Sequence, residues 1–196
     1  MRDIDVRIAL RRSDLDRFAA DGGSRVVEEM GIFRGEYRID AAVVNGHLHG
    51  YEIKSARDTL TRLPAQANAY ALVFDFLTLV AAASHLKRAA TLLPCWWGLR
   101  LAESTGTCVQ LSEIRPATRN TSVDPYHVAQ LLWKTEALEV LDRHGGARGF
   151  RSKTTFTTWR ELTRRLTLPE LQDEVRAMLK RRKSWPSAGV QPPNMS

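Results

Sequence analysis

The chain has 196 residues, of which 43% are hydrophobic and 26% are charged, so we expect a buried core and little disorder. No apolar run reaches about 18 residues, and charged residues interrupt the N-terminal apolar stretches, so we expect neither a membrane-spanning helix nor a secretory signal. These features predict a cytoplasmic protein. Cys95 and Cys108 are then expected to be free thiols.

Positive charge is concentrated near the C-terminus. Residues 143–183 contain 12 Lys and Arg against 4 Asp and Glu, which is +8, whereas residues 1–142 contain 17 against 18, which is −1. This asymmetry favours contact with a polyanion such as nucleic acid, and not with a membrane. A solvated helix face is the alternative interpretation.

Apolar periodicity, glycines and prolines divide the chain into short elements. The expected elements are a helix within 3–20, a helical turn at 24–31, strands at 37–44 and 50–55, a helix from 64 to about 76, a buried strand at 77–83, a helix at 85–93, a strand pair around "ESTG", and helices from 125 to 142 and beyond 155. This order predicts an α/β fold with a central mixed sheet flanked by helices.

Three regions are expected from this pattern. Residues 1–122 form an α/β core, residues 123–185 form a basic helical region packed on it, and residues 186–196 form an uncharged, proline-containing disordered tail.

Two acidic residues and a lysine lie on the two strands around the turn "NGHLHG". Glu52 and Lys54 are two positions apart and therefore project from the same face of their strand. A two-residue turn would place Asp40 on the opposite face from Glu52, whereas an odd-length loop or a bulge would place both carboxylates on one face. We therefore expect a loop other than the plain two-residue turn.

Carboxylates forced together repel each other unless a cation neutralises them. Mg²⁺ or Mn²⁺ takes hard oxygen ligands, and Asp40, Glu52 and the backbone carbonyl of Ile53 are the candidates here. Lys54 would position a water molecule or stabilise charge on a phosphate group. A solvated ion pair between Glu52 and Lys54 is the simpler alternative.

The spacing of Asp40 and the following Glu-x-Lys resembles the PD-(D/E)XK nuclease superfamily, although Ile39 stands where the name-giving proline would be. Gln66 and Tyr70 resemble the Gln-x-x-x-Tyr motif of its RecB-like branch, which lines the active site. The superfamily also takes an acidic metal ligand from its first helix, which implies Glu29 here, with Glu28 as the alternative.

The segment "RIDAAVVNGHLHGYEIKSARDTLTRLPAQANAY" is also similar to a small bacterial family assigned to that superfamily. The resemblance implies a restriction-endonuclease-like αβββαβ core and a Mg²⁺-dependent nuclease that hydrolyses DNA phosphodiester bonds, in DNA repair or in defence against foreign DNA. Asp40, Glu52, Lys54, Gln66 and Tyr70 would be catalytic. A non-catalytic nuclease-like module that binds nucleic acid or a protein is the alternative.

Nucleic acid contacts are expected from basic residues outside this cluster. The candidates are Arg62, Arg164, Arg165, Lys180, Arg181, Arg182 and Lys183. A homodimer or a protein partner is compatible with the sequence. His47 and His49 are interpreted as exposed residues of the turn and not as metal ligands.

Overall fold

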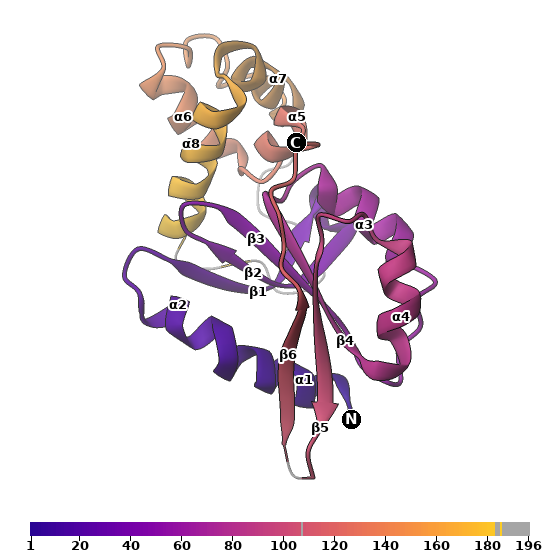
Figure 1. Ribbon diagram of the computed structural model, residues 1–196. Helices are drawn as coiled ribbons and strands as arrows, with labels where there is room; N and C mark the ends of the chain where they lie inside the picture. The colour runs from indigo at the N-terminus through magenta and orange to yellow at the C-terminus, as the bar shows by residue number, and fades with distance from the viewer. Residues whose placement is uncertain (107, 183–184, 186–196) are drawn as a thin grey trace. The chain divides into compact units, whose positions relative to one another are not determined.

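The computed structural model describes residues 1–106, 108–182 and 185, and it has an α/β fold with a six-stranded mixed sheet and C-terminal helices (Figure 1). The helices are α1 (Asp3–Leu10), α2 (Asp16–Ala20), α3 (Leu63–Ala71), α4 (Ala83–Leu92), α5 (Pro125–Ala129), α6 (Lys134–Arg143), α7 (Thr155–Arg165) and α8 (Leu168–Arg181). The strands are β1 (Arg25–Ile32), β2 (Tyr37–Val44), β3 (Leu48–Lys54), β4 (Phe76–Ala82), β5 (Gly98–Ser104) and β6 (Val109–Arg115). The expected α/β class and mixed sheet are confirmed.

The strands follow their sequence order across the sheet, from β1 to β6. The β2–β3 and β5–β6 pairs are antiparallel, whereas β3–β4 and β4–β5 are parallel. Parallel neighbours need a crossover connection, and α3 and α4 supply the two crossovers. The strand β4 has parallel neighbours on both sides, which agrees with its continuous apolar sequence.

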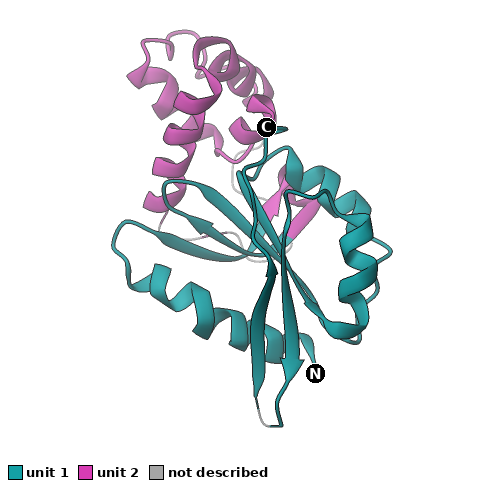
Figure 2. Ribbon diagram, viewed as in Figure 1, with its two compact units in different colours: residues 1–30, 39–122 teal, residues 31–38, 123–196 magenta. Residues whose placement is uncertain are grey.

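The chain divides into two compact units (Figure 2). The first contains residues 1–30 and 39–122, and the second contains residues 31–38 and 123–196. Within the second unit, the Phe33 ring lies 4.9 Å from that of His127, and the Arg34 guanidinium lies 5.2 Å from the Phe156 ring. The tail expected at 186–196 lies outside the described residues.

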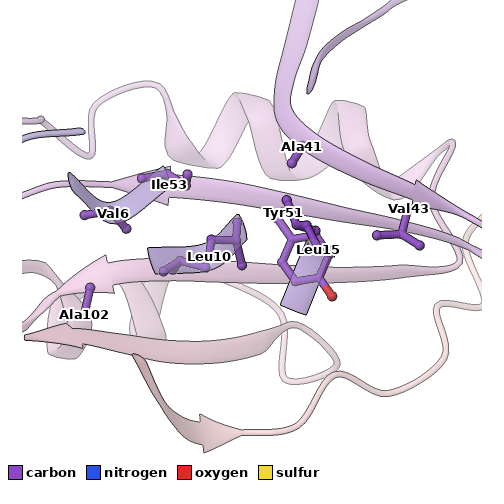
Figure 3. Close-up of a cluster of buried hydrophobic side chains, with 9 residues drawn as sticks. Val6, Leu10, Leu15, Ala41, Val43, Tyr51, Ile53 and Ala102 are labelled. Carbon is purple, nitrogen blue, oxygen red and sulfur yellow. The ribbon is translucent and has the colours of Figure 1, made fainter. Parts of the chain in front are cut away.

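A cluster of buried side chains joins the N-terminal helical segment to one face of the sheet (Figure 3). Val6, Leu10 and Leu15 come from this segment, which continues from α1 into α2 through a π-helical stretch, Arg11–Leu15. Alternate residues of β2 and β3 face this segment, namely Ala41, Val43, Tyr51 and Ile53, and Val80 of β4 and Ala102 of β5 complete the cluster. Burying each large side chain stabilises the fold by about 1.5–3 kcal/mol, so this cluster fixes the segment against the sheet.

The helical turn expected at 24–31 is wrong, because Arg25–Ile32 is the strand β1. Val27, Met30 and Ile32 are buried, and the spacing of three between the first two looked helical. In the structure, two consecutive exposed residues lie between them, and the second, Glu29, has a φ of 51°. This left-handed residue interrupts the alternation of the strand as a bulge does.

Two other expected helices differ in length from the structure. The helix beginning near Pro64 ends at Ala71. The Asn120 side chain donates hydrogen bonds to the carbonyls of Ala71 and Phe74, at 2.6 and 2.9 Å, in the segment that follows the helix. The helix expected at 125–142 is two helices, α5 and α6. Both cysteines are free, as expected, and the structure shows that both are exposed. In the described part of the chain, no helix has the length and apolar character needed to cross a membrane.

Three residues connect β2 to β3, namely Asn45, Gly46 and His47. Val44 is paired with Leu48, and the Asn45 side chain accepts a hydrogen bond from the His47 N–H at 2.9 Å. The loop therefore has the odd length that is needed to place Asp40 and Glu52 on one face of the sheet. This length sets the register of the whole β2–β3 pair.

Gly50 is the position in β3 where the packing leaves no room for a side chain. A Cβ atom there would lie 2.3 Å from Ile39 Cδ1 and 2.8 Å from Leu77 Cδ2. We predict that Gly50→Ala lowers the free energy of unfolding by about 1–3 kcal/mol, because it overpacks the core. Gly46→Ala, in the adjacent loop, has no atom within 4 Å of the new methyl group and serves as the control. Urea denaturation measures both, and equal stability of the two variants would contradict the register.

Candidate functional site

The register of β2 and β3 places Asp40 opposite Glu52. Ala41 is paired with Tyr51, and one step further along the ladder brings the two carboxylate residues together on one face. The regular pairing ends there, and the Ile53 N–H donates to the Asp40 carboxylate at 2.6 Å. The side chain of Asp40 therefore takes part in the sheet's hydrogen bonding at this point.

Glu52 and Lys54 form a buried ion pair and not a solvated one. The Lys54 ammonium lies 2.5 Å from Glu52 Oε1, and the residues are only 2% and 7% exposed. Removing two charges from water is costly, so such a pair needs further hydrogen bonds to be tolerated. The helix α3 supplies them.

Gln66 and Tyr70 lie one helical turn apart on α3, so both side chains point toward Glu52. The Gln66 amide donates to Glu52 Oε1 at 2.7 Å, and the Tyr70 hydroxyl donates to Glu52 Oε2 at 3.1 Å. Lys54 also donates to the Gln66 carbonyl oxygen at 3.2 Å. Glu52 is thus held in one orientation by three donors.

We name these five residues the carboxylate–lysine cluster: Asp40, Glu52, Lys54, Gln66 and Tyr70. The sequence predicted all five, and the structure brings them together from β2, β3 and α3. Their catalytic role stays a prediction.

Arg7 is the charged residue that the sequence pattern did not indicate. From α1 its guanidinium contacts Asp40 Oδ1 at 2.5 Å and Glu29 at 2.7 Å, and its Nε donates to Asp3 at 2.6 Å. A cation therefore already lies beside Asp40, and it links Glu29 to the cluster. Arg7 and Asp40 are 33 positions apart, so no local spacing could have revealed the pair.

Of the two glutamates considered as further ligands, only Glu29 approaches Asp40. Glu29 lies on β1 and not on a helix, and it reaches Asp40 through the shared Arg7. Glu28 instead pairs with Arg11 at 2.8 Å. The choice of Glu29 over Glu28 agrees with this placement, but the expected helical origin is wrong.

Buried charge shifts the protonation of the cluster. Burial, followed by the charge of Glu52, raises the pKa of Asp40 to about 7 from an ordinary 3.8, while Arg7 and the Ile53 N–H act in the opposite direction. Burial and then Glu52 also raise the pKa of Tyr70, so its hydroxyl stays protonated and remains a donor. The two carboxylates are thus close enough to disfavour joint ionisation.

The predicted basic residues are found in several surroundings. Arg62 is exposed at the residue preceding α3, and Arg164 and Arg165, on α7, pair with Glu161 at 2.7 and 2.5 Å. Lys180 is exposed at the end of α8. All three of these arginines are exposed, and their contact with phosphate stays a prediction.

The last predicted basic residues differ more from the expectation. Arg181 pairs with Glu139 at 2.8 Å, whereas Arg182 is 7% exposed, pairs with Glu136 and lies over the Trp133 ring at 4.4 Å. Arg182 therefore has a packing role in this structure and is not placed for a phosphate contact. Lys183 lies outside the described residues.

The donor atoms of the cluster fit a hard divalent cation. Among the described residues, no three Asp, Glu, His or Cys side chains are close enough to form a metal site by themselves. Mg²⁺, however, is typically held by one or two carboxylates together with water or phosphate oxygens. Asp40 and Glu52 would hold it, in competition with Arg7. The carbonyl of Ile53 stays a predicted ligand.

Comparison with known proteins relates the chain to a phage protein. The family model described as "Bacteriophage P4 protein cII" matches residues 12–187. "Protein cII" of Enterobacteria phage P4 is 25% identical over 145 residues, which cover 74% of this chain and 54% of the relative, so the chain spans about half of the relative's length. No solved structure matches the chain.

These matches correct the assignment drawn from the short motifs. They identify a phage protein family and not a named nuclease family, so the expected bacterial PD-(D/E)XK relationship and the assignment as a DNA nuclease in repair or defence are wrong. The physical reason is that Asp, Glu-x-Lys and Gln-x-x-x-Tyr specify only a few side chains around one hairpin. The same few contacts can arise on a chain of another family.

The raised pKa of Asp40 makes the protein's stability depend on pH. Between about pH 4 and 7 the folded protein holds a proton that the unfolded chain has lost, so the free energy of unfolding falls as the pH rises through this range. We predict a flatter slope for Asp40→Asn than for the wild type, measured by urea denaturation in EDTA. Asp16→Asn, which removes an exposed carboxylate, should keep the wild-type slope. Parallel slopes for all three proteins would contradict the shift.

Proposed function

The chain belongs to the bacteriophage P4 cII protein family, and we propose that it binds a divalent cation at the carboxylate–lysine cluster and thereby holds a phosphate group of its ligand. The observation that carries the proposal is the placement of Asp40 and Glu52 on one face of the sheet, beside the buried Lys54. The proposal concerns this chain alone, because its relative is about twice as long as the matched segment.

The balance of charge in the cluster supports a bound cation. The cluster contains two carboxylates and one buried ammonium, which pairs with Glu52. Asp40 pairs instead with the guanidinium of Arg7, from outside the cluster. A divalent ion carries twice the charge of the Arg7 guanidinium that contacts Asp40, so it would neutralise the paired carboxylates more effectively. Mg²⁺ or Mn²⁺ is the proposed ion, since all of the available donors are oxygens.

The positions of the remaining side chains support a bound phosphate group. Gln66 and Tyr70 fix the orientation of Glu52 through hydrogen bonds to both of its oxygens. Lys54 is held against Glu52 and Gln66, and its ammonium is the cluster's own donor for a phosphate oxygen. When bound, the cation would supply further positive charge to the same phosphate group.

Nucleic acid is the phosphate-bearing partner that we propose. The support comes from the formal charge of +7 and its concentration in residues 143–183, together with exposed arginines such as Arg164. Contacts to phosphates depend on such charge and carry little sequence information. Several of these arginines also pair with nearby glutamates, which reduces the positive field that they offer.

We also propose a finer description of the fold. The order of α1, β1, β2, β3, α3 and β4 is that of the αβββαβ core of restriction-endonuclease-like folds. This order supports a shared arrangement of backbone elements. Such an arrangement does not determine an activity.

The enzymatic form of the proposal is cation-dependent hydrolysis of a phosphate ester. Lys54 would stabilise the charge that develops on the phosphate, and Tyr70 and Gln66 would keep Glu52 aligned. The proposed substrate class is a phosphate ester, because the side chains of the cluster contain no feature that selects a particular leaving group.

Cation binding tests the proposal directly. We predict that Mn²⁺ binds the wild-type protein in isothermal titration calorimetry, and that Asp40→Asn or Glu52→Gln weakens binding at least tenfold by removing a ligand. Arg7→Met should strengthen it, because Arg7 competes for Asp40. Glu28→Gln is the matched control, because Glu28 pairs with Arg11. Absence of Mn²⁺ binding, or equal losses in the Glu28 and Glu52 variants, would refute the site.

Hydrolysis has a separate test. With Mn²⁺ and bis(4-nitrophenyl) phosphate as the probe, we predict release of nitrophenolate by the wild type and a loss of at least about a hundredfold in kcat/KM for Lys54→Met. Lys87→Met, at an exposed position of α4, should retain wild-type activity. Activity that survives in Lys54→Met, or that is missing from the cation-loaded wild type, would exclude the enzymatic form.

A further inference from the structure

A pocket lies on the face of β3 opposite the carboxylate–lysine cluster. Residues alternate along a strand, so His49 and Tyr51 project away from the face that carries Glu52 and Lys54. The pocket has a volume of about 350 Å³, at the small end of the range for ligand sites, and is lined by side chains from the N-terminal helical segment and from β2 to β6. It is therefore separate from the carboxylate–lysine cluster.

One wall of this pocket consists of stacked aromatic rings. The His49 and Tyr51 rings are 4.4 Å apart and nearly parallel, with an interplanar angle of 13°. Phe76, on β4, adds a third ring at 5.8 Å from His49 and also contacts His47 at 5.2 Å. Such a wall favours a flat aromatic ligand, because ring faces stack on one another.

His49 is an uncharged part of this wall, and not the exposed turn residue that the sequence suggested. A hydrogen bond of 2.9 Å joins its Nε2 to the hydroxyl of Thr78, and burial, aided by the nearby His47, lowers its pKa to about 4. A neutral ring at pH 7 contributes stacking without repelling the arginines nearby.

Three arginines and two acids line the same pocket, which leaves a formal charge of +1: Arg17, Arg100, Arg115, Asp14 and Glu113. This balance suits a single phosphate group better than a polyphosphate. Arg100 pairs with Asp14, but its buried Nε–H has no hydrogen-bond partner among the described residues. The register of the β5–β6 pair shifts between Leu99 and Arg100, so the regular alternation is interrupted at the residue that carries this donor.

From the aromatic wall, the arginines and the unpaired Arg100 donor, we propose that this pocket binds a nucleoside monophosphate. The base stacks on the partly exposed His49 ring, whose other face lies on the buried Tyr51 ring, and the phosphate is bound by Arg17, which is exposed on α2. An acceptor atom of the ligand satisfies the Arg100 Nε–H. This site does not depend on the proposed cation site.

The test is calorimetric titration of the metal-free protein with AMP, GMP, CMP and UMP. We expect at least one to bind, and the corresponding nucleoside and ribose 5-phosphate to bind at least tenfold more weakly, because each lacks one half of the recognised chemistry. Arg17→Ala should weaken binding at least fivefold, and His49→Leu should do the same through loss of stacking. A urea titration of each variant confirms that it is folded.

Two control variants show whether nucleotide binding is specific to this pocket. Arg12→Ala removes an arginine from the same helical segment that does not line this pocket, and it should change the affinity less than twofold. Glu52→Gln, on the other face of β3, should also have no effect, so failure of the cation site leaves this result unchanged. Absence of binding by all four nucleotides, equal losses for Arg12 and Arg17, or binding only of oligonucleotides would overturn the proposal.

Discussion

The register between β2 and β3 is the constraint on which the rest of the structure depends. The three-residue loop places Asp40 opposite Glu52, and the absence of a side chain at Gly50 lets Ile39 and Leu77 pack closely against the same strand. A shift by one residue would exchange the faces of β3. Glu52 and Lys54 would then face the apolar cluster of α1, and Tyr51 would face α3. Both the charged cluster and the aromatic pocket would be lost together.

Arg7 connects this register to the edge of the sheet. Its guanidinium contacts Asp3, Glu29 and Asp40, so one side chain ties α1 to both β1 and β2. Glu29 has a left-handed backbone, a conformation that costs about 1–3 kcal/mol, and its side chain pairs with Arg7. Arg7 therefore has two consequences: it ties the edge strand β1 to β2, and it places a positive charge beside Asp40. Any cation that binds Asp40 must displace the contact between Arg7 and Asp40 and replace its stabilising effect.

The sequence predicted most of the fold and the members of the cluster, but not the contacts between segments that are far apart in the sequence. Strand alternation places Glu52 and Lys54 on one face, and helical spacing does the same for Gln66 and Tyr70. The meeting of Asp40 with Glu52 depended on a loop length that the sequence left open, and the approach of α3 was implied only by the resemblance. The strand β1 was misread because the buried residues Val27 and Met30 are three positions apart, a helical spacing, with the left-handed Glu29 between them. Arg7 and the buried Arg182 depend on long-range contacts, which no spacing encodes. The family assignment was wrong because it rested on a few motif side chains. Such residues describe the geometry of a site but do not identify the family of the chain.

The two faces of β3 show how a single strand can support different chemistry on either side. The even-numbered residues Glu52 and Lys54 are buried as ions, which is tolerable only because Gln66 and Tyr70 complete their hydrogen bonds. The odd-numbered residues His49 and Tyr51 are stacked rings whose burial is favourable without such partners. A ligand on the ionic face must therefore be charged, because it has to replace the ion-pair contacts of Glu52 and Lys54 that it breaks. A ligand on the aromatic face gains affinity mainly by stacking on the rings and burying apolar surface. This difference follows from β3 being an internal strand with both faces covered, and it makes recognition on the two faces chemically independent.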